Sequence, residues 1–112
     1  AALAARAPGP SRFEGIAHLR LKESDRIEAI ASLLAAAGAG AQARSDSLSV
    51  DGAADLPAAG AARKLPTFGD HRIAMAAALL SLALPGLLIE NPACVAKSYP
   101  RFFADLETLV RR

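Results

Sequence analysis

The chain has 112 residues, which is enough for one domain or part of one. An apolar fraction of 53% and a charged fraction of 21% exclude a disordered chain. A net charge of +2, scattered basic residues and few aromatic residues argue against a nucleic-acid partner. No apolar run reaches the roughly 18 residues of a membrane helix, so we expect no membrane span.

The single cysteine, Cys94, excludes an internal disulfide and argues against a secreted disulfide scaffold. Its neighbours Ala93 and Val95 indicate a buried thiol rather than a nucleophile. The first residues resemble no signal peptide and include no initiator methionine, so we expect a cytoplasmic fragment or processed product. The two histidines lie far apart without a cysteine cluster, which argues against a metal site.

The first third of the chain predicts a loose start, a strand and a helix. Residues 1–12 are rich in Ala, Pro and Gly and are expected to be loose. Residues 13–21, FEGIAHLRL, predict a half-buried strand, because apolar and polar side chains alternate over residues 17–21. A helix with apolar residues at helical spacing begins near Ser24 or Asp25, either of which can cap it, and ends at Gly38.

The middle of the chain predicts a hairpin and a second helix. Residues 41–52, AQARSDSLSVDG, indicate two short strands around a turn at Ser45 and Asp46, and an Ala/Gly loop over 53–63 follows. The second helix follows TFGDHR, with Asp70 as its N-cap, and ends at Pro85-Gly86. Its apolar stripe comprises Ile73, Ala76, Ala77, Leu80 and Leu84.

The last third predicts a strand in LLIEN, a turn at Asn91-Pro92 and another short extended piece in CVA. KSYPRFFADLETLV predicts a third helix with Pro100 in its first turn. Its expected core contacts are Phe102, Phe103, Leu106, Leu109 and Val110. The order of elements is therefore β-α-β-β-α-β-(β)-α, which is an α/β pattern.

Charged residues gather where the three predicted helices begin. They are Lys22, Glu23 and Arg26 at the first helix, Asp70, His71 and Arg72 at the second, and Lys97 before the third. Cations are disfavoured there, because the N-terminal end of a helix carries a partial positive charge. An anionic ligand would explain them, and four cations suit a ligand that carries both phosphate and carboxylate. They converge if the three helices begin at one edge of the sheet.

Each candidate also has a purely structural interpretation. Arg26 could pair with nearby carboxylates on a wet surface, where such pairs contribute little stability. Arg72 and Lys97 could be solvated helix ends, and His71 could belong to the helix cap formed with Asp70. Spacing alone leaves these alternatives open.

Three motifs, LKESDR, GDHRIAM and NPACVAKSYPRFFADL, resemble in order and spacing the C-terminal segment of the EPSP synthase (3-phosphoshikimate 1-carboxyvinyltransferase) family. The similarity runs from about Ile16 to Leu109 and covers about the last quarter of the family's length. It implies an α/β fold made of β-α-β-β-α-β-type units of the enolpyruvyl transferase inside-out barrel (EPT fold), with a closing C-terminal helix. Residues 13–112 would be the C-terminal part of an enolpyruvyl transferase domain.

The resemblance also implies an activity. The family transfers the enolpyruvyl group of phosphoenolpyruvate to the 5-hydroxyl of shikimate 3-phosphate and releases phosphate, without metal or organic cofactor, on the way to chorismate and the aromatic amino acids. The partner would be the remainder of the same polypeptide, with its N-terminal domain and catalytic aspartate, so the isolated chain is expected to be inactive. The alternative is a stand-alone α/β module that binds phosphate-bearing ligands or a partner without catalysis.

The resemblance assigns roles residue by residue. Lys22 and Glu23 would be catalytic, with Glu23 in proton transfer, and the substrate-binding residues would be Lys22, Arg26, Asp70, His71, Arg72, Lys97 and His18. Two departures from the family pattern stand out. His18 replaces an asparagine that touches shikimate 3-phosphate in many members, and Ser98-Tyr99 replaces a common Thr-Phe.

Overall fold

The computed structural model describes residues 1–52, 63–83 and 86–110. Its elements, in chain order, are α1 (Ala2–Arg6), β1 (Gly9–Phe13), the 3₁₀ helix η1 (Ala17–Leu21), α2 (Arg26–Ala36), β2 (Gly40–Ala43), β3 (Leu48–Gly52), β4 (Arg63–Leu65), α3 (His71–Ala83), β5 (Leu87–Ile89), the 3₁₀ helix η2 (Pro92–Lys97) and α4 (Phe102–Val110). The predicted α/β class is confirmed. No helix in these ranges is both long and apolar enough to cross a bilayer.

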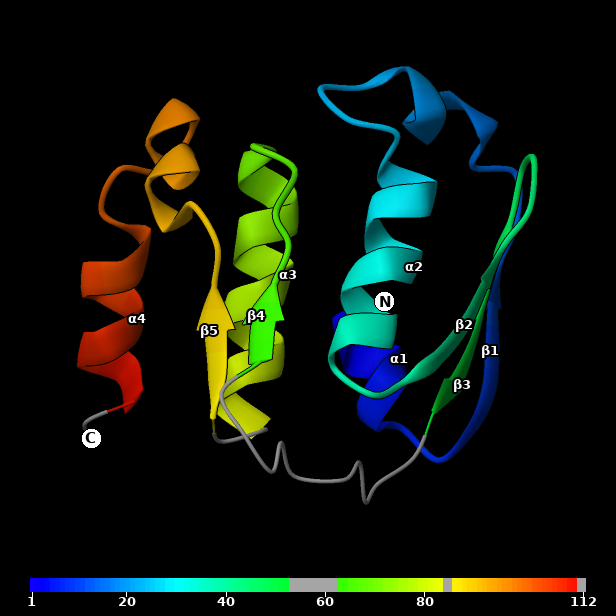
Figure 1. Cartoon of the computed structure of the whole chain (residues 1–112), viewed down its shortest axis with the longest axis horizontal. Helices are drawn as coiled ribbons and strands as arrows, with labels where there is room; N and C mark the ends of the chain where they lie inside the picture. Colours follow the sequence, from blue (N-terminus) through cyan, green and yellow to red (C-terminus); the bar gives the residue numbers. More distant parts are fainter. Residues whose placement is uncertain (53–62, 84–85, 111–112) are drawn as a thin grey trace.

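Two small sheets flank a central group of helices. The first sheet is antiparallel with the order β1-β3-β2, and the second is the parallel pair β4-β5. Figure 1 shows the antiparallel sheet on one side, α2 and α3 in the middle, and α4 on the opposite side. Helix α1 packs against β3 and α3, and α2 packs against β2, η1 and α3.

The core lies between α2, α3 and the two sheets. Its members are mainly Leu, Ile, Val and Ala. Those on or next to the two long helices include Ala29, Leu33, Leu34, Ala37, Ile73, Ala77 and Leu80, and those on strands β3 and β4 are Leu48, Val50 and Leu65. The small alanines among them allow the helices to approach closely, and this packing fixes the relative positions of the ends at which α2 and α3 begin.

Several local predictions are confirmed. Asp25 is the N-cap of α2, and its Oδ1 accepts a hydrogen bond from the Glu28 N–H at 3.3 Å. Helix α2 ends at Ala36, and Gly38 follows with a φ of 90°, a conformation that glycine adopts readily. Strands β2 and β3 form the predicted hairpin, and Leu87–Ile89 forms the strand predicted in LLIEN.

Two predictions for the first 21 residues are wrong. Residues 1–12 are not loose, because they contain α1 and most of β1. Residues 17–21 form the 3₁₀ helix η1 rather than a strand. The physical reason is register: β1 already pairs with β3, so Phe13 lies opposite Leu48 and the later residues have no free strand beside them.

Three predictions for the C-terminal third also fail. CVA belongs to η2, which begins after Asn91 takes up a left-handed conformation with a φ of 44°. Helix α4 begins at Phe102, and none of its residues is buried. The side chains of Leu109 and Val110 are 64% and 56% exposed, so they do not supply core contacts. Strand β4 was not predicted, and the predictions for 53–62 and 84–85 lie outside the described residues.

Candidate functional site

Three segments that are distant in sequence meet at one end of the fold. Residues 22–25 lead into α2, the turn after Thr67 leads into α3, and η2 follows β5. Figure 1 shows α2 and α3 beginning at this end, at the top of the view, with η2 beside them. Parallel strands β4 and β5 both run toward it. In open α/β sheets, ligand-binding loops collect at the carboxyl ends of parallel strands.

A buried ion pair joins the starts of α2 and α3. The Arg26 guanidinium donates from Nε to Asp70 Oδ2 at 2.8 Å and from Nη2 to Asp70 Oδ1 at 3.2 Å. The Ser24 hydroxyl donates to Oδ2 at 2.7 Å, and the Arg72 N–H donates to Oδ1 at 3.0 Å. Both oxygens of Asp70 therefore have partners, which is needed because its side chain is fully buried.

The surroundings of Asp70 favour its charged form. Burial by itself raises the pKa of this carboxyl, but the hydrogen bonds from Arg26, Ser24 and the Arg72 N–H outweigh it. The pKa of Asp70 therefore lies below its ordinary value of 3.8. The N–H of Arg72 is in the first turn of α3, so the predicted N-cap role of Asp70 is confirmed together with its second role as the partner of Arg26.

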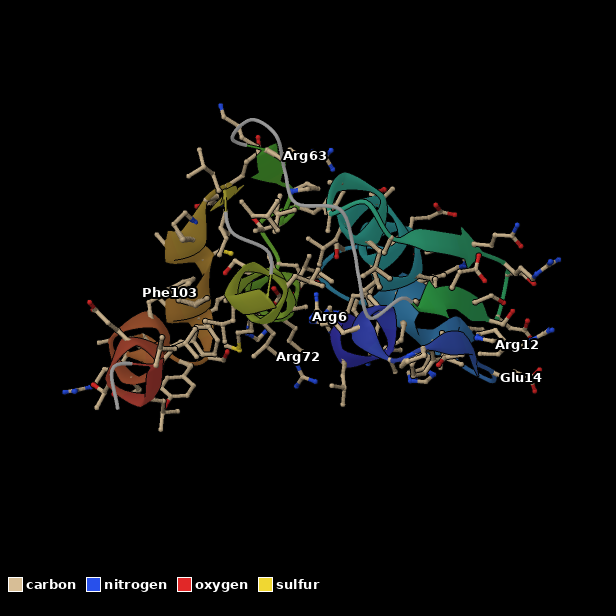
Figure 2. The ribbon with its side chains drawn as sticks, turned by 90° about the horizontal axis from the view of Figure 1, so that it is seen from below. Arg6, Arg12, Glu14, Arg63, Arg72 and Phe103 are labelled. Atoms are coloured by element: carbon tan, nitrogen blue, oxygen red, sulfur yellow. The ribbon has the colours of Figure 1, made fainter. Side chains whose placement is uncertain are left out.

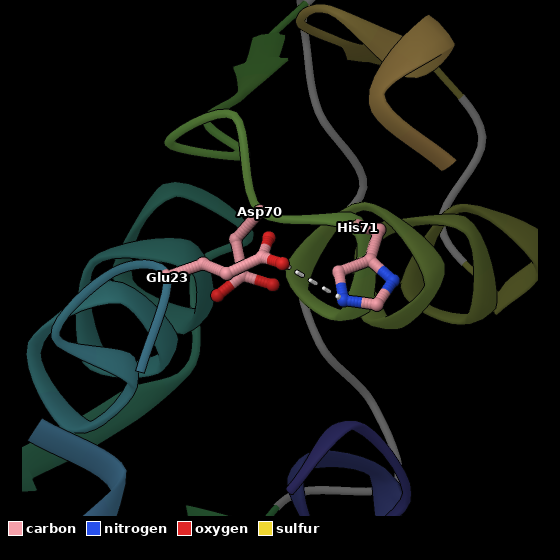
Figure 3. A group of neighbouring side chains, drawn as sticks. All are labelled: Glu23, Asp70 and His71. Carbon is pink, nitrogen blue, oxygen red and sulfur yellow. Dashed lines mark ion pairs between the residues drawn. The ribbon is translucent and has the colours of Figure 1, made fainter. Parts of the chain in front are cut away.

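Glu23 is at the centre of a second, more exposed cluster. Its Oε1 lies 3.2 Å from Lys97 Nζ and 3.6 Å from His71 Nε2. The other ring nitrogen of His71, Nδ1, is hydrogen-bonded to the Ser98 hydroxyl. Figure 3 shows the Glu23 carboxylate between Asp70 and His71. All three segments thus contribute to one network, and one oxygen of Glu23 faces two nitrogen groups.

Not every candidate joins this network. In the described part of the chain, the side chains of Lys22, Arg72 and His18 make no hydrogen bond or ion pair, and all three residues are exposed. Figure 2 shows the Arg72 side chain extending outward from α3. Lys22 precedes Glu23 directly, whereas His18 lies on η1. Among the described residues, Lys22 and Arg72 are therefore cations without a counter-ion.

Arg26 also keeps part of its guanidinium available. Its Nη1 has no hydrogen bond, and the only fully buried side-chain polar atom without a partner among the described residues is Ser47 Oγ. Nη1 must therefore retain contact with solvent. The structural alternative for Arg26, a pair with nearby carboxylates on a wet surface, is wrong, because its partner Asp70 is 44 residues away and buried.

The sequence pointed to most of this cluster but missed two hydroxyl groups. Ser24 was a candidate helix cap, yet its hydroxyl donates to Asp70, and Asp25 caps α2 instead. Ser98 was noted only as a departure from the family pattern, and its contact with His71 depends on η2 docking against α3. Neither contact has a signal in local spacing.

The ligand atoms of Glu23, Asp70 and His71 lie within 4.8 Å of one another, close enough for one metal ion. The oxygens of Asp70, however, already accept hydrogen bonds from Arg26, and Glu23 already faces Lys97. A divalent cation here would lie beside two positive side chains in a partly buried place, where charge repulsion is strong. Arg26 and Lys97 pair with the two carboxylates, and Lys22 and Arg72 are next to them in sequence, so the cluster favours an anionic ligand instead.

Comparison with known proteins gives one consistent result. The chain is 44% identical over 106 residues to a 3-phosphoshikimate 1-carboxyvinyltransferase of Methanoculleus marisnigri, covering 95% of this chain and 24% of that protein. It is 44% identical over 110 residues to the protein of the same name from Syntrophobacter fumaroxidans, covering 97% and 25%. The chain thus spans about a quarter of the length of these curated relatives.

The fold agrees with the sequence. An EPSP synthase structure from Acinetobacter baumannii superimposes with a TM-score of 0.79 at 33% identity, over 90% of this chain and 24% of that one. A second structure of EPSP synthase from the same organism gives a TM-score of 0.80 at 28% identity. The family model of EPSP synthase (3-phosphoshikimate 1-carboxyvinyltransferase) matches residues 1–106. Sequence, fold and the three quoted motifs therefore lead to one conclusion: the chain belongs to the EPSP synthase family.

Proposed function

We propose that this chain contributes the phosphoenolpyruvate-binding part of an EPSP synthase active site and works together with the rest of a polypeptide of its relatives' length. Residues 13–112 would be the C-terminal part of an enolpyruvyl transferase domain. The observation that carries the proposal is the convergence of Lys97, Arg26 and the Glu23–His71 cluster at one end of the fold, beside the unpaired Lys22 and Arg72. A small trianion is the kind of ligand that such an excess of cations suits.

The reaction that we assign moves an enolpyruvyl group. The 5-hydroxyl oxygen of shikimate 3-phosphate bonds to C2 of phosphoenolpyruvate, the hydroxyl loses its proton, and C3 gains one. The resulting tetrahedral intermediate then loses phosphate from C2 and a proton from C3, which restores the double bond. Every step uses only protons and the two substrates, so the proposal requires no metal or organic cofactor.

Cations stabilise this intermediate because carboxylate and phosphate share one carbon. Within residues 1–52, 63–83 and 86–110, Arg72 and Lys22 have no counter-ion to displace, and Arg26 Nη1 has no hydrogen bond. Asp70 would act by holding Arg26 rather than by touching an anionic substrate, since two negative groups would repel each other. Arg26, which Asp70 fixes before any substrate binds, does not need to reorganise during the reaction, and this is the main advantage of such a site.

Glu23 is the group to which we assign proton transfer at C3. Lys97 and His71 hold its Oε1, whereas its Oε2 has no hydrogen bond or ion pair in the described residues. A carboxyl group that is fixed through one oxygen can present the other to a substrate carbon. Lys22 would contact the reacting hydroxyl, and His18 would lie toward shikimate 3-phosphate. We further propose a cytoplasmic location, as expected from the sequence.

A chimera tests the proposal directly. In the Methanoculleus relative, the segment that matches this chain is replaced by residues 1–106, and the product is assayed for phosphate release from phosphoenolpyruvate and shikimate 3-phosphate. We expect kcat within about tenfold of the parent enzyme. The control carries Lys22→Ala and Arg72→Ala together. We expect its rate of phosphate release to rise with phosphoenolpyruvate concentration without reaching saturation.

Two outcomes contradict the proposal. A folded chimera without turnover would mean that this chain does not complete the active site. If that inactive chimera still bound phosphoenolpyruvate, the stand-alone binding module would be favoured. Unchanged kinetics in the double variant would mean that the exposed cations are only a solvated surface, which is the structural alternative for Arg72.

A further inference from the structure

We propose that Ser98 is a positioning residue that holds the ring of His71 with Nε2 toward Glu23, so that the neutral ring carries its proton on Nε2 and turns that N–H to the carboxylate. The tautomer claim stands on the contacts alone, and its catalytic consequence rests on the function proposed above. Ser98 is the first residue after η2, and its hydroxyl contacts His71 Nδ1 at the start of α3.

The first step of the argument concerns Nε2. This nitrogen lies 3.6 Å from Glu23 Oε1, and a carboxylate can only accept a hydrogen bond. If the neutral imidazole carried its proton on Nδ1, the lone pair of Nε2 would face the lone pairs of Glu23. The contact is favourable only when Nε2 carries a proton. Figure 3 shows the ring turned so that this nitrogen faces the carboxylate.

The second step concerns Nδ1. In the tautomer with a proton on Nε2, Nδ1 is a bare acceptor and requires a donor. The Ser98 hydroxyl is the partner of Nδ1, and a hydroxyl can rotate to donate. The same hydroxyl can accept a hydrogen bond from the Nδ1–H of a doubly protonated ring, so Ser98 tolerates both charge states of His71. The choice between the neutral tautomers is therefore made at Nε2 by Glu23, and Ser98 holds the ring in the orientation that keeps Nε2 toward that carboxylate.

The third step links this contact to the proposed chemistry. The His71 side chain is 12% exposed, so water has limited access to replace a lost partner. Lys97 Nζ approaches the same oxygen of Glu23 at 3.2 Å, and Lys97 immediately precedes Ser98. One short segment therefore supplies both the cation that holds Glu23 and the hydroxyl that orients its second neighbour. Precise orientation of Glu23 should affect turnover more than substrate binding.

The test reads the tautomer of His71 in the 112-residue chain by the nitrogen-15 shifts of its ring. Spectra are recorded above about pH 8, where an ordinary imidazole is neutral. We compare the unmodified chain with Ser98→Ala, Ser98→Thr and Ser32→Ala, since Ser32 is an exposed serine of α2 whose side chain makes no hydrogen bond in the described residues. His18, exposed on η1, is the internal reference in every sample.

We expect Ser98→Ala to lower the ratio of the two neutral tautomers, Nε2–H over Nδ1–H, by about fivefold, because a ring no longer held at Nδ1 can turn Nε2 away from Glu23, the contact that favours the proton there. Ser98→Thr should keep the ratio within about twofold, and Ser32→Ala and the His18 signals should not change. A decrease smaller than about threefold in Ser98→Ala would overturn the proposal. This readout does not depend on catalysis, so it stands if the chimera proves inactive.

In an active chimera, Ser98→Ala should lower kcat by about tenfold with little change in KM for phosphoenolpyruvate, and Ser98→Thr should restore it. An equal rise in KM with unchanged kcat would contradict the positioning role.

Discussion

Asp70 controls both the stability and the shape of the candidate site. It receives four hydrogen bonds, from Ser24, from the Arg72 N–H and twice from Arg26. Those bonds place Arg26 with two donors turned inward and Nη1 outward. A change of Arg26 to Lys would keep the charge but lose the paired geometry, and the first loss would be the contact with Asp70 rather than one with a ligand.

We expect Asp70→Asn to destabilise the chain by roughly 3–5 kcal/mol, because it leaves the buried Arg26 without a counter-charge. Urea unfolding at pH 7 measures this loss. The control is Asp46→Asn, since Asp46 is exposed and its side chain has no hydrogen bond in the described residues. A loss below about 1 kcal/mol for Asp70→Asn would mean that the pair contributes little to the fold.

The pH dependence of that difference has a definite sign. Because the pKa of Asp70 is lower in the folded state, the unfolded chain binds more protons as the pH falls below about 4. The stabilisation from Asp70 is therefore complete above its ordinary pKa of 3.8 and is lost as the pH falls through the lower folded-state value. We expect the gap between the unmodified chain and Asp70→Asn to narrow below pH 4, as measured by urea unfolding at several pH values. A gap that widens on acidification would contradict the assignment.

Glu23→Gln in the chimera tests the proton-transfer role. Glutamine keeps the shape and can still accept a hydrogen bond from Lys97, but it cannot exchange a proton. We expect kcat to fall by about 100- to 10,000-fold with KM for phosphoenolpyruvate within about threefold. Glu14→Gln is the control, because Glu14 pairs with Arg12 at the exposed end of β1. Unchanged kcat in Glu23→Gln would remove this residue from the mechanism.

At the scale of the elements, the close approach of α1 to β3 depends on one glycine. A Cβ added to Gly52 would lie 1.8 Å from the carbonyl oxygen of Ala7 and 2.4 Å from that of Ala4. Both are backbone atoms, so no side chain can rotate away. Residues 1–12 look loose by composition, yet this contact and the pairing of β1 with β3 attach them to the core.

We therefore expect Gly52→Ala to destabilise the chain by about 2 kcal/mol or more, with increased protease sensitivity confined to α1 and β1. Gly40→Ala is the matched control in the same sheet, because its added Cβ would meet only the side chain of Asp51, at 3.1 Å. We expect it to cost less than about 1 kcal/mol, measured by urea unfolding. Equal effects of the two substitutions would mean that glycine flexibility, not the contact with α1, is what matters.

Elements with local causes were predictable, whereas elements that depend on distant partners were not. Helix α2 follows from its cap at Asp25 and its apolar spacing, and the hairpin follows from its turn. Strand β4 is three residues long and is a strand only because it pairs with β5, which follows α3 in the chain. The alternation over residues 17–21 resembles a strand, but these residues form η1. Strand β1 already occupies that edge of β3, and Arg20 donates to the carbonyl of Ser45.

The candidate site divides in the same way. The excess of cations at helix starts is visible in the sequence. Lys22, Glu23 and Arg72 can be selected as candidates from their positions there. The pairing of Arg26 with Asp70 across 44 residues depends on how α2 packs against α3, so no local pattern indicates it. For the same reason, the sequence predicts Arg26 as a free cation, whereas two of its nitrogens, Nε and Nη2, donate to Asp70 in the structure.

At the scale of the whole molecule, several apolar side chains of the described helices are exposed. Leu3 on α1 is 84% exposed, and Leu79 and Leu82 on α3 are 53% and 51% exposed. Leu3 and Leu79 also line a hollow between these helices, together with Ala2 and Arg6. The chain spans only about a quarter of its relatives' length. On the proposed function, the remainder of such a polypeptide would complete the site at this end of the chain.

We therefore expect the 112 residues alone to bind phosphoenolpyruvate weakly without turning it over. Four cations supply attraction, but proximity of both reactants is worth roughly 7–11 kcal/mol of barrier, and one wall cannot hold two substrates in reacting positions. Calorimetry should show binding that weakens strongly between about 10 mM and 150 mM salt, since screening shortens the reach of exposed charges from roughly 30 to 8 Å. Arg72→Ala should weaken it further, whereas Arg12→Ala, at the far end of β1, should not. The decisive measurement is phosphate release with both substrates, beside the active chimera. Turnover by the isolated chain within a hundredfold of the chimera would mean that this unit holds a complete active site by itself.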